Sequence, residues 1–141
     1  MDFKKYIPHR AYYYITQWIN ELNIDVQFVN SRKTKLGDYR FRNNQHFITV
    51  NNNLNKYAAL ITLTHEIAHA FTFAEFGKTI KPHGIQWKEN FKKLMLTFFD
   101  YNIFPDEGLT NPDTIFNIVV LPHPDGPRIA YLFPSSFFLH C

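Results

Sequence analysis

The chain has 141 residues, a formal net charge of +3 and a single cysteine, Cys141. A hydrophobic fraction of 45%, with 15 phenylalanines, excludes a disordered chain and favours one globular domain. The lone cysteine excludes a disulfide framework. No apolar run approaches the roughly 20 residues of a membrane span, and the first residues lack the apolar core of a signal peptide. A cytoplasmic protein is therefore expected, or a nuclear one in a eukaryote, with no membrane partner.

The N-terminal region predicts a helix and then a strand. Apolar residues recur at helical spacing over residues 8–22, and Pro8 suits the first turn of a helix. Residues 24–29 alternate between apolar and polar types, which is typical of a strand with one buried face.

A hairpin is expected next. Leu36-Gly37-Asp38 is a turn signal, and residues 39–42 then alternate as a strand. Residues 43–45 predict a tight turn, and residues 46–51 predict the second strand of the hairpin. His46 on this strand is interpreted as a surface histidine rather than as a metal ligand.

The most informative segment follows, and it reads Thr64-His65-Glu66-Ile67-Ala68-His69-Ala70. This is an H-E-x-x-H motif in a run of residues compatible with a helix. Positions i and i+4 share one helix face, so His65 and His69 can bind the same metal ion, with Glu66 beside them as a candidate base. Two imidazoles and an adjacent carboxylate are the groups that zinc-assisted hydrolysis requires.

Apolar residues surround the motif and predict that the helix is buried. Two histidines and a glutamate in such a helix would be costly without a partner, which favours a functional site over incidental polar residues. Asn53 and Asn55 are alternative N-caps for this helix, and Gly77 is its expected C-terminal end.

A catalytic zinc site needs a third protein ligand, and His83 is the first candidate. It lies in a turn that contains proline and glycine, ahead of a second amphipathic helix with apolar residues at positions 87, 91, 94, 95 and 98. That turn can bring His83 back over the first helix. Glu75 and Glu89 are rival ligands, although Glu75 lies on a different helix face and Glu89 is interpreted as a solvated charge.

Four blocks of the chain carry a family resemblance, and they are residues 31–40 (SRKTKLGDYR), 48–51 (ITVN), 65–69 (HEIAH) and 83–88 (HGIQWK). Together they resemble the SprT-like domain, the metallopeptidase family that includes the DNA-dependent protease Spartan. The resemblance extends from about residue 6 to residue 105. It implies that His65, His69 and His83 bind one catalytic zinc ion and that Glu66 is the catalytic base. In Spartan-like members it further implies cleavage of proteins bound or crosslinked to DNA.

The expected fold is α+β and zincin-like, with a small antiparallel or mixed sheet packed on the H-E-x-x-H helix and flanking helices that cover it. In zincins an edge strand beside the site receives the substrate as an added strand, and the strand over residues 46–51 is the candidate. The metallopeptidase domain is expected over residues 1–105. Residues 106–141 are a proline-rich extension, in which two apolar runs around a proline- and glycine-rich turn predict a hairpin. Many relatives carry a cysteine-rich zinc ribbon after this domain, which a single cysteine cannot form.

Positive charge is distributed unevenly along the chain. Residues 1–104 contain 14 Lys/Arg and 8 Asp/Glu, whereas residues 105–141 contain 1 and 4. Ten of these 14 positive residues gather in two groups, which are Arg32, Lys33, Lys35, Arg40 and Arg42, and Lys78, Lys81, Lys88, Lys92 and Lys93. Contact with DNA or RNA phosphates and an ordinary solvated surface are both consistent with these groups.

Three functions are compatible with these patterns. The favoured one is a zinc metalloendopeptidase of the SprT-like type, which hydrolyses protein or peptide substrates, including proteins associated with nucleic acid. The alternative is a non-catalytic nucleic-acid-binding module stabilised by zinc, but a purely structural site has no need of Glu66. The third is a zinc hydrolase that acts on a non-protein amide or ester.

Overall fold

The computed structural model describes residues 3–101, 103, 117–121 and 128–132. Its α-helices are α1 (Tyr12–Leu22), α2 (Lys56–Phe76) and α3 (Ile85–Asp100), and its 3-10 turns are η1 (Lys4–Tyr6), η2 (His9–Ala11) and η3 (Gly77–Thr79). Its strands are β1 (Ile24–Val29), β2 (Gly37–Arg42), β3 (Gln45–Asn51), β4 (Asn117–Leu121) and β5 (Arg128–Leu132). The α+β class is confirmed. Among the described residues, no helix combines the length and the hydropathy that a membrane crossing needs.

The main sheet is mixed, and β3 is its central strand. β1 pairs parallel with one edge of β3 and β2 pairs antiparallel with the other, while β4 and β5 form a separate antiparallel pair. The prediction that residues 46–51 form an edge strand was therefore wrong, and β1 and β2 are the edge strands of this sheet. The local pattern indicated the hairpin of β2 and β3. It did not indicate that β1, which precedes β2 in the chain, pairs in parallel with β3.

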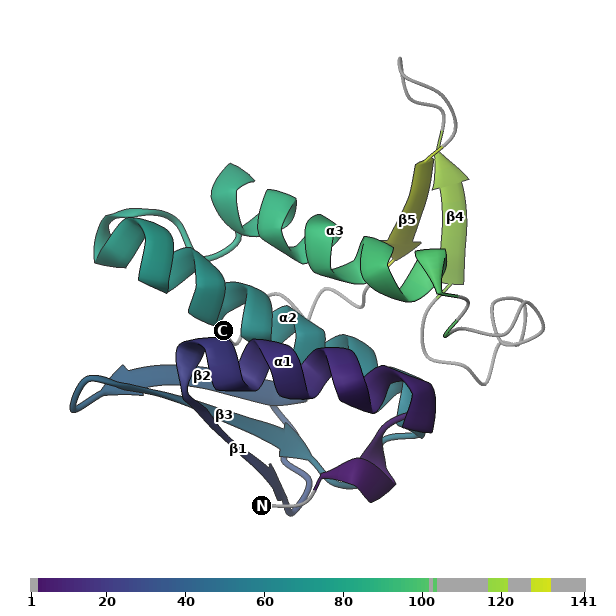
Figure 1. Cartoon of the computed structure of the whole chain (residues 1–141), viewed down its shortest axis with the longest axis horizontal. Coiled ribbons are helices and arrows are strands. Elements are labelled where there is room, and N and C mark those ends of the chain that lie inside the picture. The colour runs from purple at the N-terminus through teal and green to yellow at the C-terminus, as the bar shows by residue number, and fades with distance from the viewer. Residues whose placement is uncertain (1–2, 102, 104–116, 122–127, 133–141) are drawn as a thin grey trace.

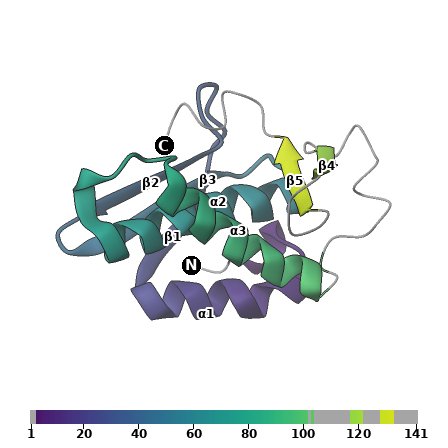
Figure 2. The same cartoon turned by 90° about the horizontal axis from the view of Figure 1, so that it is seen from above.

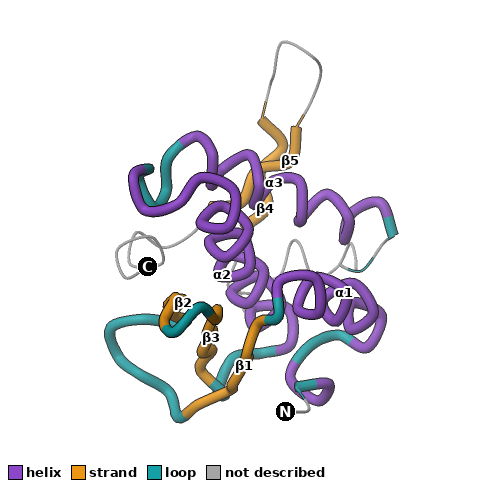
Figure 3. The backbone as a smooth tube through the Cα atoms, turned by 60° about the vertical axis from the view of Figure 1, so that its left-hand side comes forward, coloured by secondary structure: helices purple, strands orange, loops and turns teal. Residues whose placement is uncertain are grey.

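The helices lie on one side of this sheet, as Figures 1 and 3 show from two directions. α2 packs directly on the sheet, and α3 packs on α2 further from it. α1 runs along one side of the molecule (Figure 2), where it contacts β1 and α2. This layering encloses α2 between the sheet and the other two helices.

α2 is the centre of the hydrophobic core. Every residue from 58 to 70 is buried, as expected for a helix that is apolar on all sides. At its N-terminus the side-chain oxygen of Asn55 accepts a hydrogen bond of 2.8 Å from the backbone N–H of Ala58, so Asn55 and not Asn53 is the N-cap. At its C-terminus Gly77 adopts a φ of 76°, which confirms the predicted end of the helix.

Two element boundaries differ from the sequence pattern. The helix predicted over residues 8–22 begins with the 3-10 turn η2 and becomes α-helical at Tyr12. Gly37 and Asp38, predicted to lie in a turn, are the first two residues of β2 and pair with Val50 and Thr49 of β3. The glycine is used for a close approach between backbone and helix, described below, and not to turn the chain.

Candidate metal centre

The residues of the H-E-x-x-H motif are buried in the middle of α2. His65 is fully buried, and Glu66 and His69 are only 2% and 8% exposed. The two histidines are one helical turn apart, so their rings lie on the same face with their centroids separated by 5.0 Å. Burial of three such polar side chains requires compensating partners.

The third imidazole comes from the segment between α2 and α3. His83 stands directly before Gly84, the N-cap residue of α3, and the segment folds back toward the motif helix. Its Nε2 lies 3.1 Å from Nε2 of His69 and 3.2 Å from Nε2 of His65. One ring nitrogen from each of the three residues lies within 4.8 Å of the others.

This donor set fits a metal ion. In a tetrahedral zinc site with Zn–N bonds of about 2.0–2.1 Å, two ligand nitrogens are about 3.3–3.4 Å apart. The observed separations of 3.1 and 3.2 Å are close to that spacing. Facing lone pairs of neutral imidazoles repel one another at this distance unless a proton or a cation lies between them, and imidazole suits zinc, copper, iron and nickel. The three histidines could therefore hold one metal ion.

Burial keeps these imidazoles in the form that binds metal. It lowers the pKa of His65 well below the ordinary value of 6.5 and that of His69 to about 3, and the neighbouring histidines add to both shifts. Burial, followed by the positive charge of Lys88, also lowers the pKa of His83. Since neutral imidazole is the ligand form, metal binding near neutral pH requires no deprotonation of these rings.

Trp87 of α3 packs against all three imidazoles. Its indole is 1% exposed, and the ring centroids of His65, His69 and His83 lie 4.6, 5.3 and 4.7 Å away. Its Nε1–H donates a 3.2 Å hydrogen bond to the backbone carbonyl of His65. The indole therefore both ties α3 to the motif helix and restricts the rings that carry the ligand nitrogens. The apolar spacing of α3 predicted that Trp87 is buried, but gave no sign of this supporting role.

Strand β2 comes very close to Glu66 at Gly37. A Cβ atom at position 37 would lie 2.9 Å from Cγ2 of Thr62 and 3.1 Å from both Cγ and Oε1 of Glu66. Any side chain at this position would therefore press on the motif helix and on the carboxylate. Gly37 allows the sheet backbone to form one wall around the candidate base.

Tyr39 lies two residues further along β2, on the same face of the strand. Its ring is nearly parallel to that of His69, at an angle of 12° and a centroid distance of 6.3 Å, and its hydroxyl lies 2.7 Å from Nδ1 of His46. Burial raises the pKa of Tyr39 and lowers that of His46, so both the hydroxyl and the imidazole of this hydrogen-bonded pair are uncharged near neutral pH. His46 is 7% exposed, and its prediction as a surface residue was wrong.

The rival ligands lie elsewhere. Glu75 and Glu89 are both exposed, and the group that could hold a metal ion in the described part of the chain consists of the three histidines alone. His123, His140 and Cys141 are not expected to form a second metal site, because the spacing and the partners of a closed site are missing, and these three residues are outside the described part of the chain.

Residues 9–106 match the model of the SprT-like family. The chain belongs to the SprT-like family. The match covers more than two thirds of the 141 residues and includes all three histidines and Glu66, and it confirms the membership that the four sequence blocks predicted. No curated relative and no solved structure matches the chain.

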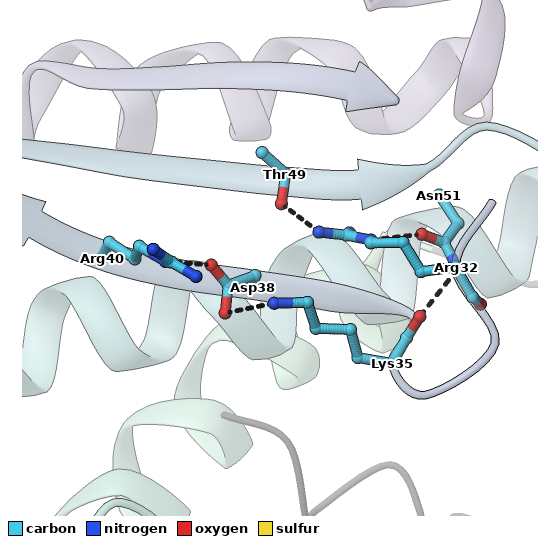
Figure 4. A network of polar contacts seen from close by, with 6 residues as sticks. All are labelled: Arg32, Lys35, Asp38, Arg40, Thr49 and Asn51. Carbon is cyan, nitrogen blue, oxygen red and sulfur yellow. Dashed lines mark hydrogen bonds and ion pairs between the residues drawn. The ribbon is translucent and has the colours of Figure 1, made fainter. Parts of the chain in front are cut away.

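In this SprT-like chain a polar network fixes the segment that leads into Gly37. Asn51, at the end of β3, is 2% exposed, and its Nδ2 donates to the backbone carbonyls of Arg32 at 3.2 Å and Lys35 at 2.8 Å. Its Oδ1 accepts from Nε of Arg32 at 2.9 Å, and Nη1 of Arg32 donates to Thr49 at 2.8 Å (Figure 4). The network holds the start of β2 beside the end of β3, and so supports the close approach of Gly37 to α2.

Ion pairs beside this network involve further residues of the first positive group of this SprT-like chain. Nζ of Lys35 lies 3.1 Å from one carboxylate oxygen of Asp38, and Nε of Arg40 lies 2.8 Å from the other (Figure 4). With Arg32 bound to Asn51 and Thr49, three members of that group have intramolecular partners. The carboxylate of Asp38 offsets one positive charge of the group, so its net charge is lower than the count of lysines and arginines alone suggests.

Proposed function

We propose that this SprT-like chain is a zincin-like, zinc-dependent peptidase, in which His65, His69 and His83 hold one zinc ion and Glu66 is the catalytic base. The observation that carries the proposal is the convergence of three buried or half-buried imidazole nitrogens within 4.8 Å, with Glu66, a buried glutamate that is only 2% exposed, directly following His65 in the sequence of α2. When bound, zinc would act as a Lewis acid and lower the pKa of water toward neutrality. Three protein ligands would leave one position open for water or substrate.

The chain's own residues supply the proton chemistry and the binding surface. Glu66 would accept a proton from water and pass it to the leaving amine. Gly37 leaves the space in which this carboxylate lies. The backbone of an extended substrate would pair with the edge of β2, which has no strand partner on its outer side among the described residues. Such a peptide would pass both Glu66 and His69, since Gly37 and Tyr39 of β2 contact these two residues.

Nucleic-acid-associated proteins are the substrates that we propose on the basis of the family resemblance and of charge, and a cytoplasmic or nuclear location belongs to the same proposal. Lys88, Lys92 and Lys93 of α3 are all exposed, and the charge of Lys88 is close enough to His83 to lower its pKa. Binding of a DNA or RNA oligonucleotide to these lysines should weaken steeply with salt. An affinity that does not change with salt would exclude the phosphate contacts.

The peptidase is tested with three variants measured for zinc content and for hydrolysis of casein. Glu66→Gln should keep both zinc and fold and lose at least about 100-fold in rate, because the proton acceptor is gone. His83→Ala should lose zinc and activity together, and zinc should no longer raise its melting temperature. Glu89→Gln, an exposed glutamate of α3, is the matched control and should behave as the wild type.

Two results would contradict the proposal. Full activity of Glu66→Gln would show that the base is a different group. A zinc-loaded wild type that hydrolyses no protein or peptide would favour the non-catalytic nucleic-acid-binding module instead.

A further inference from the structure

A cavity of about 240 Å³ opens directly beside the candidate metal centre, with His69 in its wall. It lies between Tyr39 of β2, the last turns of α2 and the segment that leads to His83. Its size suits one side chain rather than a stretch of peptide. Because one of its walls is a candidate zinc ligand, a group bound there would belong to a residue next to the reacting bond.

The lining of this cavity is apolar with a positive rim. Tyr39, Phe73, Ile80 and Pro82 provide the apolar surface. Lys78 and Lys81, both exposed, are the cationic lining residues, and no described lining residue is acidic. Such a site attracts a side chain that combines a short apolar stem with a negative end, and it repels a positive one.

We propose that this cavity receives the substrate side chain adjacent to the scissile bond and selects glutamate or aspartate there. The inference rests on the proposed peptidase activity and names the substrate class of that same site. The methylene groups of the acidic side chain would pack on Tyr39 and Phe73, while its carboxylate would reach the ammonium groups of Lys78 and Lys81. A lysine or arginine in the same place would face two like charges as well as the metal ion.

A peptide side chain explains the cavity better than a nucleic-acid phosphate does. A phosphate backbone is long and needs a row of cations along an open surface. Here two lysines border a small hollow with aromatic and aliphatic walls, which would leave a phosphate in contact with mostly apolar groups. Contact of Lys78 and Lys81 with an oligonucleotide is therefore the competing outcome of the test.

The experiment begins with zinc-loaded wild-type protein and casein, whose cleavage sites are mapped by mass spectrometry. Acidic residues should be enriched at one position next to the cleaved bond. Four synthetic peptides that carry Glu, Gln, Leu or Lys at that position are then compared by kcat/KM. Replacement of Glu by Gln should lower kcat/KM by about three- to tenfold, the size expected for one or two partly exposed ion pairs, and Lys should be the poorest substrate.

Charge reversal makes the test specific to the cavity. Lys78→Glu/Lys81→Glu should invert the order of the Glu and Lys peptides. Lys33→Glu/Lys56→Glu changes the net charge equally at two exposed positions outside the cavity and should leave the order unchanged. Equal rates for all four peptides, or a preference for Leu that the Lys78 and Lys81 reversal does not alter, would overturn the inference while the peptidase assignment stands.

A peptide-binding experiment separates acidic side-chain selection by the cavity from oligonucleotide binding by the same lysines. The four peptides are labelled and bound to zinc-loaded Glu66→Gln protein, with fluorescence anisotropy as the readout, so that selectivity is measured without turnover. Tighter binding of the Glu peptide, lost on reversal of Lys78 and Lys81, supports the cavity inference independently of any effect on the rate of hydrolysis. If the reversal instead abolishes oligonucleotide binding and leaves the peptide order unchanged, the inference is wrong.

Discussion

The carboxylate of Glu66 occupies a space that exists because position 37 has no side chain. Gly37 is the first residue of β2, and the nearest atoms to a Cβ there belong to Thr62 and to Glu66 itself. The fit between strand and helix is therefore determined by single atoms. Close-packed interiors do not absorb an added methyl group without displacement of a neighbour.

The variant Gly37→Ala is expected to lose stability and activity together. The added methyl group would lie 2.9 Å from Cγ2 of Thr62 and 3.1 Å from Oε1 of Glu66, and relief of such contacts typically costs about 1–3 kcal/mol of the free energy of unfolding. Urea unfolding and kcat/KM on the same preparation measure the two effects.

A second substitution separates the two contacts. Thr62→Ser removes the Cγ2 methyl group, so Gly37→Ala/Thr62→Ser should regain more stability than activity, because the clash with Glu66 persists. Recovery of both to the same extent would show that the contact with Glu66 does not matter for catalysis.

At the scale of elements, α2 combines two roles that are usually separate, because the helix at the centre of the core also carries the candidate site. Its buried polar groups are tolerated because hydrogen bonds inside the helix satisfy some of them. Thr64 and Thr72 each donate to the carbonyl four residues earlier, at 2.7 Å. A defect at the end of α2 should lower the stability of the whole domain, because this helix forms the centre of the core. It should leave the geometry of the candidate site unchanged.

Asn55→Ala tests this separation at the N-cap of α2. Loss of the 2.8 Å hydrogen bond to the N–H of Ala58 is expected to lower the free energy of unfolding by about 0.5–2 kcal/mol. Zinc content and kcat/KM of the folded protein should not change, since the cap lies more than two turns from His65. Asn55→Asp keeps an acceptor and should retain wild-type stability. A fall in zinc affinity with no change in the free energy of unfolding would contradict this prediction.

The elements were predictable where their signals are local. Helical spacing, the caps at Asn55 and Gly77, and the two asparagines of the β2–β3 turn, with φ of 50° and 63°, all act over a few residues. The parallel pairing of β1 with β3 was not predictable in this way, because many other pairings of two alternating segments satisfy the same pattern. Residues 46–51 were wrongly predicted as an edge strand because this parallel pairing was not recognised.

The candidate site likewise contains residues that local spacing predicted and residues whose role depends on tertiary contacts. The H-E-x-x-H spacing placed His65, Glu66 and His69 on a helix, and a turn before the next helix made His83 the best third ligand. The groups that surround them come from through-space contacts with other elements. Gly37 looked like a turn residue, and Trp87 like any apolar residue of an amphipathic helix. Their roles depend on which element packs against which, and spacing within one element does not encode that.

At the scale of the whole molecule, the burial of α2 couples the histidines to folding stability. An imidazole that is neutral when folded and protonated when unfolded makes the stability depend on pH. The pKa of His69 is lowered by burial from 6.5 to about 3, and that of His65 is lowered in the same direction. Between these two values the unfolded chain binds protons that the folded chain does not.

The metal-free protein is therefore expected to lose stability in acid. The contribution of His69 is complete above pH 6.5 and declines as the pH falls through this window toward 3. Urea unfolding at pH 7, 6, 5 and 4, in the presence of a chelator, measures the decline. His69→Gln does not titrate and should show a shallower dependence. An identical pH dependence in the two proteins would contradict the burial effect on this ring.

The short segment over residues 77–84 joins two properties of the molecule that could have been independent. It supplies one imidazole of the metal centre and five lining residues of the neighbouring cavity. A single-residue insertion or deletion there would move both at once. Divergence in this stretch is therefore expected to proceed by exchange of side chains at constant length, with Lys78 and Lys81 free to vary while His83 is kept.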